Sequence, residues 1–212
     1  MKFMSAMFLI GVVVLLTMAG YGETLDESDA AVTIDAIVNK NKNVQNQYAF
    51  LYLHDNEGKV EIDNAAVKSE LGSKKELPHD IRSSPWPSNS VDTNLLLSAP
   101  DKYGTPNRRH AESKLFPHLL DMITGYKSRH NSLCPNYILL GSVYTPCLGK
   151  NDKSSGCAPE YLAAKKDAEI GCPNTKFYLY IRSPEKTYDK VLLNETLDLI
   201  RDKDIEILTP KN

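Results

Sequence analysis

The sequence predicts an α/β fold in which a single mixed five-stranded sheet is flanked by helices. Helix-like and strand-like patterns alternate along the 212 residues in the order α-β-β-α-β-α-β-α-β. The strand–helix–strand units that follow residue 107 require parallel neighbouring strands joined by right-handed crossovers. A chain of this length is long enough for one domain with a proper hydrophobic core.

The first part of the predicted fold is a helix followed by a β-hairpin. Ser28 is a good N-cap, and apolar residues recur at helical spacing over residues 28–40. Gln47–His54 is rich in tyrosine, phenylalanine and leucine, as a buried strand is. Turn residues follow at positions 55–58, and Lys59–Ile62 alternates as a return strand would.

A long polar insertion at about 63–109 interrupts this pattern. It contains five prolines and Trp86, the only tryptophan of the chain. A loop of this length inside a compact domain is either functional or weakly ordered. Short helical turns are predicted at Val67–Leu71 and Asn94–Leu97.

In the second half of the chain the alternation of helix and strand patterns is clearer. Asn107–Arg129 reads as a helix, with a kink or break near Ser113 because Pro117 cannot donate a backbone hydrogen bond. The other predicted elements are strands at Tyr137–Tyr144, Thr175–Arg182 and Ile205–Leu208, and helices at about 157–170 and Tyr188–Arg201.

The first 22 residues are predicted to be a secretory signal peptide. Lys2 gives a positive start, Phe3–Met18 is almost entirely apolar, and Gly20 and Gly22 are small residues suited to a cleavage site. An uncleaved membrane anchor is the alternative, but the apolar run is shorter than the ~20 residues that span a bilayer. We therefore expect a secreted, extracellular protein whose single domain covers residues 23–212, with no transmembrane segment in the mature chain.

Charge and glycosylation signals agree with that expectation. The net charge of −2 gives the chain no global attraction to nucleic acid, so such binding would need a local basic patch. Asn194-Glu195-Thr196 is an acceptor for N-glycosylation on the secretory route.

The four cysteines can pair in three ways, or two can pair while two bind a metal. Cys134 and Cys172 are each followed by proline, and each stands just before a predicted strand. Because those two strands should be neighbours in the sheet, we predict a Cys134–Cys172 disulfide.

The other two cysteines belong to a pattern that suggests chemistry. His110, Cys147 and Cys157 could hold a zinc ion tetrahedrally and leave its fourth position for water. Glu112, two residues after the histidine, could shuttle the proton that hydrolytic deamination needs. Cys147 follows directly from a predicted strand end, where ligand sites lie in sheets of this kind. The alternative is a Cys147–Cys157 disulfide that closes a small loop.

With these residues, the chain resembles the cytidine deaminase-like superfamily of zinc deaminases. That family has the same order of elements, with H-x-E opening the second helix and P-C-x-x-C at the next strand-to-helix junction. The resemblance covers roughly residues 28–208, and here Leu148–Gly156 takes the place of the two-residue spacer. It implies that His110, Cys147 and Cys157 bind zinc and that Glu112 is the catalytic acid and base.

The resemblance also implies a substrate class. A helix separates the last two strands, which should then run parallel, as in the branch that acts on bases in RNA or DNA and includes secreted toxin-like deaminases. Hydrolytic deamination of a nucleobase is implied, with cytosine favoured over adenine. A nucleoside or a single-stranded nucleic acid is the expected partner.

Four further residues are weaker candidates for substrate contact. Arg108 and Arg109 could bind a phosphate, although paired arginines are more often simply solvated. Tyr144 and Trp86 could stack on a base, although core packing for Tyr144 and a loop-pinning role for Trp86 are the commoner alternatives.

A second hypothesis has no catalysis. The chain would then be a disulfide-stapled secreted protein, such as an extracellular matrix, venom or defence component. It would retain the fold and bind matrix partners through its long polar loop.

Overall fold

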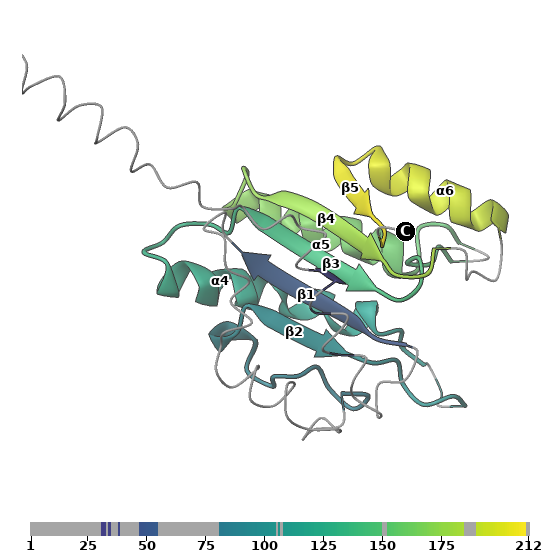
Figure 1. The fold of residues 1–212 in the computed structure, drawn as a ribbon, viewed down its shortest axis with the longest axis horizontal. Coiled ribbons are helices and arrows are strands. Elements are labelled where there is room, and N and C mark those ends of the chain that lie inside the picture. The colour runs from purple at the N-terminus through teal and green to yellow at the C-terminus, as the bar shows by residue number, and fades with distance from the viewer. Residues whose placement is uncertain are drawn as a thin grey trace, which may run out of the picture.

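The sheet contains five strands in the order β2-β1-β3-β4-β5 (Figure 1). We describe the protein from a computed structural model, for residues 31, 32, 34, 38, 47–54, 81–104, 106, 108–149, 152–184 and 190–210. The strands are β1 (Ala49–His54), β2 (Leu95–Ser98), β3 (Tyr137–Ser142), β4 (Lys176–Ile181) and β5 (Ile205–Leu208). β1 is antiparallel to both of its neighbours, whereas β3, β4 and β5 run parallel. The predicted α/β class with a single mixed five-stranded sheet is therefore confirmed.

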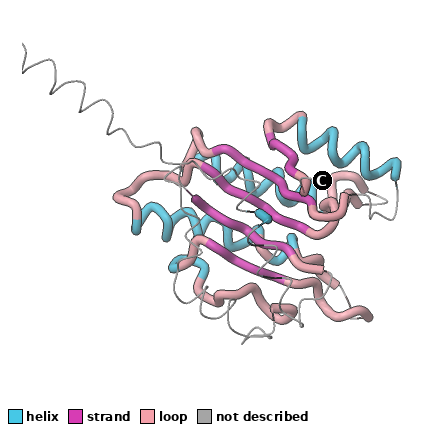
Figure 2. The backbone as a smooth tube through the Cα atoms, viewed as in Figure 1, coloured by secondary structure: helices cyan, strands magenta, loops and turns pink. Residues whose placement is uncertain are grey.

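In the part of the chain described from residue 108 onward, three α-helices connect the strands (Figure 2). They are α4 (Leu119–Arg129), α5 (Cys157–Gly171) and α6 (Lys190–Arg201). α5 crosses from β3 to β4 and α6 crosses from β4 to β5, as the strand–helix–strand pattern predicted. The helices and strands after residue 118 agree with their predicted ranges to within two residues at most ends.

The two faces of the sheet bury separate apolar clusters because successive side chains of a strand point to opposite sides. One cluster joins alternate residues of β1, such as Leu51 and Leu53, to α4, α5 and the end of α6. The other cluster contains Phe50 and Tyr52 of β1. It also contains three buried residues of the predicted first helix that the structure describes, Ala31, Ile34 and Val38. The sheet is thus covered on both faces.

The partner of β1 differs from the prediction. Asn94–Leu97 was predicted to be a short helical turn, but Leu95–Ser98 is strand β2 and pairs with Ala49–Tyr52. The return strand predicted at Lys59–Ile62 and the turn predicted at Val67–Leu71 lie outside the described residues. With β2 on one edge of β1 and β3 on the other, the long insertion itself supplies a strand of the sheet.

The helix predicted over Asn107–Arg129 is interrupted before Pro117, as the proline suggested. Regular α-helix begins only at Leu119. Two short 3₁₀ turns precede it, η4 (Glu112–Lys114) and η5 (Phe116–His118). Residues 108–110 are not helical, so His110 stands on an irregular segment before the first turn. This corrects the prediction that it opens a helix.

No helix within the described ranges is long and apolar enough to cross a membrane. The predicted signal peptide at residues 1–22 lies outside those ranges.

Candidate metal centre

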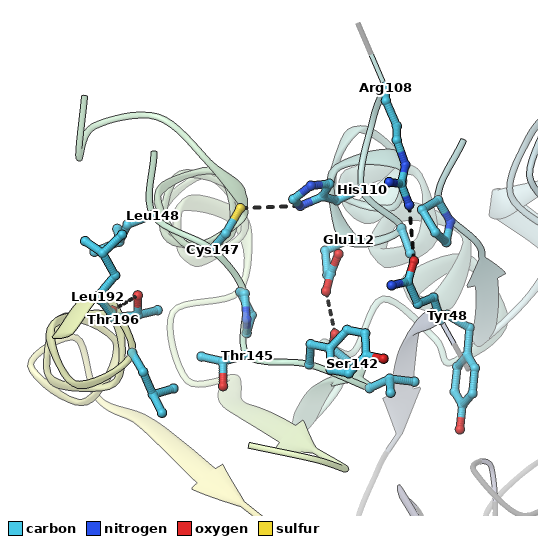
Figure 3. Close-up of a pocket in the computed structure, with 17 residues that line it drawn as sticks. Tyr48, Arg108, His110, Glu112, Ser142, Thr145, Cys147, Leu148, Leu192 and Thr196 are labelled. Carbon is cyan, nitrogen blue, oxygen red and sulfur yellow. Dashed lines mark hydrogen bonds between the residues drawn. The ribbon is translucent and has the colours of Figure 1, made fainter. Parts of the chain in front are cut away.

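Three separate segments meet at the carboxyl end of β3, where ligands bind in sheets with parallel strands. The irregular segment before η4 carries His110, the loop after β3 carries Cys147, and Cys157 is the first residue of α5. Figure 3 shows the Cys147 sulfur facing the ring of His110, with the Glu112 carboxylate beside them.

The ligand atoms of these residues are spaced as zinc ligands are. His110 Nδ1 lies 3.4 Å from Cys147 Sγ and 3.3 Å from Cys157 Sγ, and the two sulfurs are 3.6 Å apart. A tetrahedral zinc ion with bonds of about 2.3 Å to sulfur and about 2.0 Å to nitrogen places two sulfurs about 3.8 Å apart and a sulfur and a nitrogen about 3.5 Å apart. His110, Cys147 and Cys157 therefore form a group that could hold a metal ion.

The described residues between the cysteines, 148–149 and 152–156, are hydrogen-bonded to one another, and the residue after Cys157 is hydrogen-bonded to Cys147. The backbone N–H of Gly149 donates to the Ser155 carbonyl at 2.7 Å, and the N–H of Ala158 donates to the Cys147 carbonyl at 3.0 Å. Gly156 has a φ of 104° and a ψ of 176°, a conformation that is essentially restricted to glycine. These hydrogen bonds hold the two described ends of the spacer together and place Cys157 beside Cys147.

The charges of the cluster suit cation binding. The adjoining Cys157 thiol, with further hydrogen bonds from His110 and the Cys157 backbone N–H, lowers the pKa of Cys147 to about 4. The same hydrogen bond to Cys147 raises the pKa of His110. The contact with Cys147 and burial raise the pKa of Cys157. One thiolate is thus present at neutral pH, and a bound metal would displace the remaining protons.

Glu112 lies beside the cluster with only 8% of its surface exposed. The Ser142 hydroxyl donates to its Oε1, and its Oε2 lies 3.9 Å from Cys157 Sγ. Burial raises the pKa of this carboxyl, while the Ser142 hydrogen bond lowers it. A carboxyl group with a raised pKa can both accept and return a proton near neutral pH.

A cavity of about 580 Å³ opens over these groups. His110, Glu112 and Cys147 line one part of it, and α6 contributes a wall that includes Leu192 and Thr196 (Figure 3). This volume is in the range of ordinary small-molecule sites.

Two of the four weaker candidates line this cavity, namely Arg108 and Tyr144. Arg109 instead lines a second cavity of about 760 Å³, on the side of α4 and α5. Trp86 lines neither cavity: it is buried in the cluster on the opposite face of the sheet and forms a β-bridge with Leu97. This position agrees with the alternative suggested for Trp86, the pinning of the long insertion.

The predicted disulfide and the predicted glycosylation site can also be placed. Cys134 and Cys172 are joined by a disulfide with their Cα atoms 5.6 Å apart. Cys147 and Cys157 are free thiols, so the alternative Cys147–Cys157 disulfide is not formed. Asn194 is exposed on α6, and the hydroxyl of Thr196 in the same tripeptide donates to the Leu192 carbonyl.

Three residues near the site were not predicted. Ser142 ends β3, and its place at the carboxyl end of a strand was a usable signal. Lys114 is buried, and its ammonium donates to the carbonyls of Arg82 and Ala99 and to Asp101 Oδ1. Nothing local in the sequence marks Lys114 or Asp101, because their meeting depends on the fold of the insertion.

Comparison with protein-family models, curated proteins and solved structures finds no match to this chain.

Proposed function

We propose that this chain is a secreted zinc-dependent enzyme that hydrolytically deaminates a nucleobase, cytosine in preference to adenine. The observation that carries the proposal is a buried carboxyl, Glu112, beside three side chains with zinc-ligand spacing, two of which, His110 and Cys147, line the same cavity as Glu112. The resemblance of H-A-E and P-C to the deaminase motifs supports the same reaction. The Cys134–Cys172 disulfide supports passage through an oxidising compartment.

His110, Cys147 and Cys157 would hold the zinc ion. When bound by such ligands, zinc supplies Lewis acidity that lowers the pKa of water from its bulk value toward neutrality. The free thiol state of both cysteines fits this role, because a disulfide would remove two ligands. The hydrogen bonds from Gly149 to Ser155 and from Ala158 to Cys147, with the glycine conformation of Gly156, support the approach of Cys157 to Cys147.

Glu112 would move the proton. In hydrolytic deamination, water adds to the ring carbon that bears the amino group, and the carbon–nitrogen bond then breaks. Glu112 accepts a proton from the attacking water and returns it to the leaving amino group, so that one water is consumed and one ammonia is released. The Ser142 hydroxyl holds the carboxyl in place for both transfers.

The decisive experiment combines metal content, thiol count and turnover on protein purified from a secretory host. We expect one zinc per chain, two zinc-protected thiols and release of ammonia from a cytosine-containing substrate. Glu112→Ala should abolish turnover and retain zinc, whereas Glu206→Ala, an exposed glutamate on β5, should retain both.

Two results would contradict the proposal. Protein without zinc and with both cysteine pairs oxidised would rule out the metal site and favour the non-catalytic, disulfide-stapled alternative. Zinc-loaded protein that releases ammonia from no cytosine or adenine compound would leave the metal site in place and reject the deaminase activity.

A further inference from the structure

Arg108 is held at the cavity by groups that carry no charge. Its Nε donates to the Asp101 backbone carbonyl at 3.0 Å, and its Nη2 donates to Gln47 Oε1 at 3.2 Å. The guanidinium also lies 5.7 Å from the centre of the Tyr103 ring. In the described parts of the chain no carboxylate comes within ion-pair distance of Arg108, so its positive charge stays available.

The neighbouring Arg109 is engaged differently. Its backbone N–H and its Nε both donate to Asp101 Oδ2, at 2.9 and 3.5 Å. Asp101 Oδ1 accepts from the buried ammonium of Lys114 at 3.1 Å. The single carboxylate of Asp101 therefore serves two cations, and Arg108 adds a third positive charge beside it. A chain with a net charge of −2 thus has a local excess of positive charge at this point.

Arg108 and Glu112 line the same cavity, and Figure 3 shows the guanidinium of Arg108 on the side of His110 and Glu112. A base that reaches Glu112 would have the rest of its molecule within the same 580 Å³. A guanidinium has five N–H donors, and the two hydrogen bonds to Asp101 and Gln47 leave others free. Its planar fork matches the oxygen atoms of a phosphate group.

We infer that Arg108 binds a phosphate of the substrate, so that the substrate is a nucleotide and not a free nucleoside. This inference rests on the proposed function. Arg108 fixes the phosphate while Glu112 faces the base. Arg109 is not part of this contact, because its backbone N–H and its Nε already donate to Asp101 Oδ2 and, unlike Arg108, it does not line the cavity that contains Glu112.

The phosphate can belong to a mononucleotide or to a nucleic-acid strand. Arg108 lines both cavities, as do His110 and Cys147. A phosphate at Arg108 therefore stands where the two cavities meet, with space for a chain to continue past it. The two sources share the same chemistry, and a comparison of ligands distinguishes them.

The test measures binding in the absence of turnover. Zinc-loaded Glu112→Gln protein is titrated calorimetrically with cytidine, cytidine 5′-monophosphate and a single-stranded trinucleotide with a central cytosine. We expect at least one phosphorylated ligand to bind about ten- to a hundredfold more tightly than cytidine, the range of a charge-assisted hydrogen-bonded contact. The trinucleotide binding more tightly than the monophosphate would indicate a strand, and the reverse order a mononucleotide.

Added substitutions assign the contact to its residue. Arg108→Ala should remove the advantage of the phosphorylated ligand and leave cytidine affinity unchanged, which also shows that the cavity is intact. Arg108→Lys should keep part of the advantage because it keeps the charge but loses the fork. Arg109→Ala, the matched control, should keep nearly all of it.

The inference is overturned if phosphorylated ligands bind no more tightly than cytidine, or if none of the three ligands binds. It is also overturned if Arg109→Ala weakens phosphorylated ligands as much as Arg108→Ala does. These failures differ from failure of the proposed function. Equal turnover of cytidine and its monophosphate by wild-type and Arg108→Ala protein would reject the phosphate contact and keep the deaminase. Arg108-dependent phosphate binding without any deamination would keep the phosphate contact and reject the deaminase activity.

Discussion

The Sγ atoms of Cys147 and Cys157 lie 3.6 Å apart, in contact but not bonded. Both also contact His110 Nδ1, and the backbone N–H at the start of α5 points to the Cys147 sulfur at 3.5 Å. A thiolate between a histidine ring and a helix N-terminus is stabilised by both. The two cysteines are thus arranged for a shared cation, whereas Cys134 and Cys172 in the same chain are covalently joined.

This arrangement predicts that zinc stabilises the folded protein. A ligand that binds only the native state adds about 2.7 kcal/mol when its free concentration is a hundred times its Kd. We expect a chelator to lower the melting temperature of wild-type protein by several degrees and added zinc to restore it. Differential scanning calorimetry checks this shift.

The matched variant for that prediction is Cys147→Ser. It keeps the size of the side chain but loses the sulfur ligand, so its melting temperature should not respond to chelator or zinc. An equal response in Cys147→Ser and wild-type protein would show that the metal binds elsewhere.

Ser142→Ala should shift the pH dependence of turnover. The Ser142 hydroxyl stabilises the ionised carboxylate of Glu112 and so lowers its pKa against the effect of burial. Without that hydrogen bond the pKa of Glu112 rises further. Because the proposed base must be ionised to accept a proton, the acidic limb of the kcat/KM profile should move to higher pH.

The control for this shift is Ser98→Ala, a buried serine at the end of β2 whose hydroxyl donates to the Ala99 carbonyl. Its profile should match that of the wild type. An acidic limb that stays in place in Ser142→Ala would argue that Glu112 is not the group seen in the profile.

Much of the fold was predictable because its signals are local. α5 and α6 have clear boundaries in the sequence, and β5 was predicted at Ile205–Leu208, the range the structure has. β2 was not predictable in this way. Its three leucines follow a polar, proline-rich stretch, and they form a strand only because they pair with Ala49–Tyr52, more than forty residues earlier.

Some residues of the candidate site were likewise predictable from local signals, whereas others depend on contacts between distant parts of the chain. The positions of His110, Cys147 and Cys157 relative to predicted elements indicated that they would meet, and the structure brings their ligand atoms within 4.8 Å. The roles of Asp101 and Lys114 come from a contact between the insertion and η4, which no spacing rule reveals. The difference between Arg108 and Arg109 likewise depends on where Asp101 lies.

Asp101→Asn should lower the free energy of unfolding at neutral pH and change it little in acid. The backbone N–H of Arg109, together with Lys114, holds the pKa of Asp101 below its ordinary value of 3.8. A lowered folded-state pKa contributes stability above pH 3.8, and that stability is lost as the pH falls through the folded value.

The measurement is the free energy of unfolding by urea across this pH range for wild-type and Asp101→Asn protein. The difference between them should be largest near neutral pH and should shrink as the carboxyl of the wild type is protonated. A difference that is constant with pH would mean that the Asp101 charge contributes nothing and that only side-chain shape matters.

Gly156→Ala tests whether the loop between the cysteines sets the metal site. A Cβ at Gly156 would lie 2.6 Å from the Cys147 carbonyl oxygen, and the φ of 104° is one that a residue with a Cβ avoids. We expect a loss of about 1–3 kcal/mol in stability from backbone strain. Because the displaced backbone carries Cys157, zinc affinity should fall as well.

Gly171→Ala is the control, since a Cβ there meets nothing within 4 Å at the end of α5. It should leave zinc affinity unchanged and keep or slightly raise stability, as replacement of a helical glycine does. Titration with a competing chelator and urea unfolding measure both quantities. Equal zinc affinity in the two variants would show that Cys157 is positioned by α5 itself and not by the loop that precedes it.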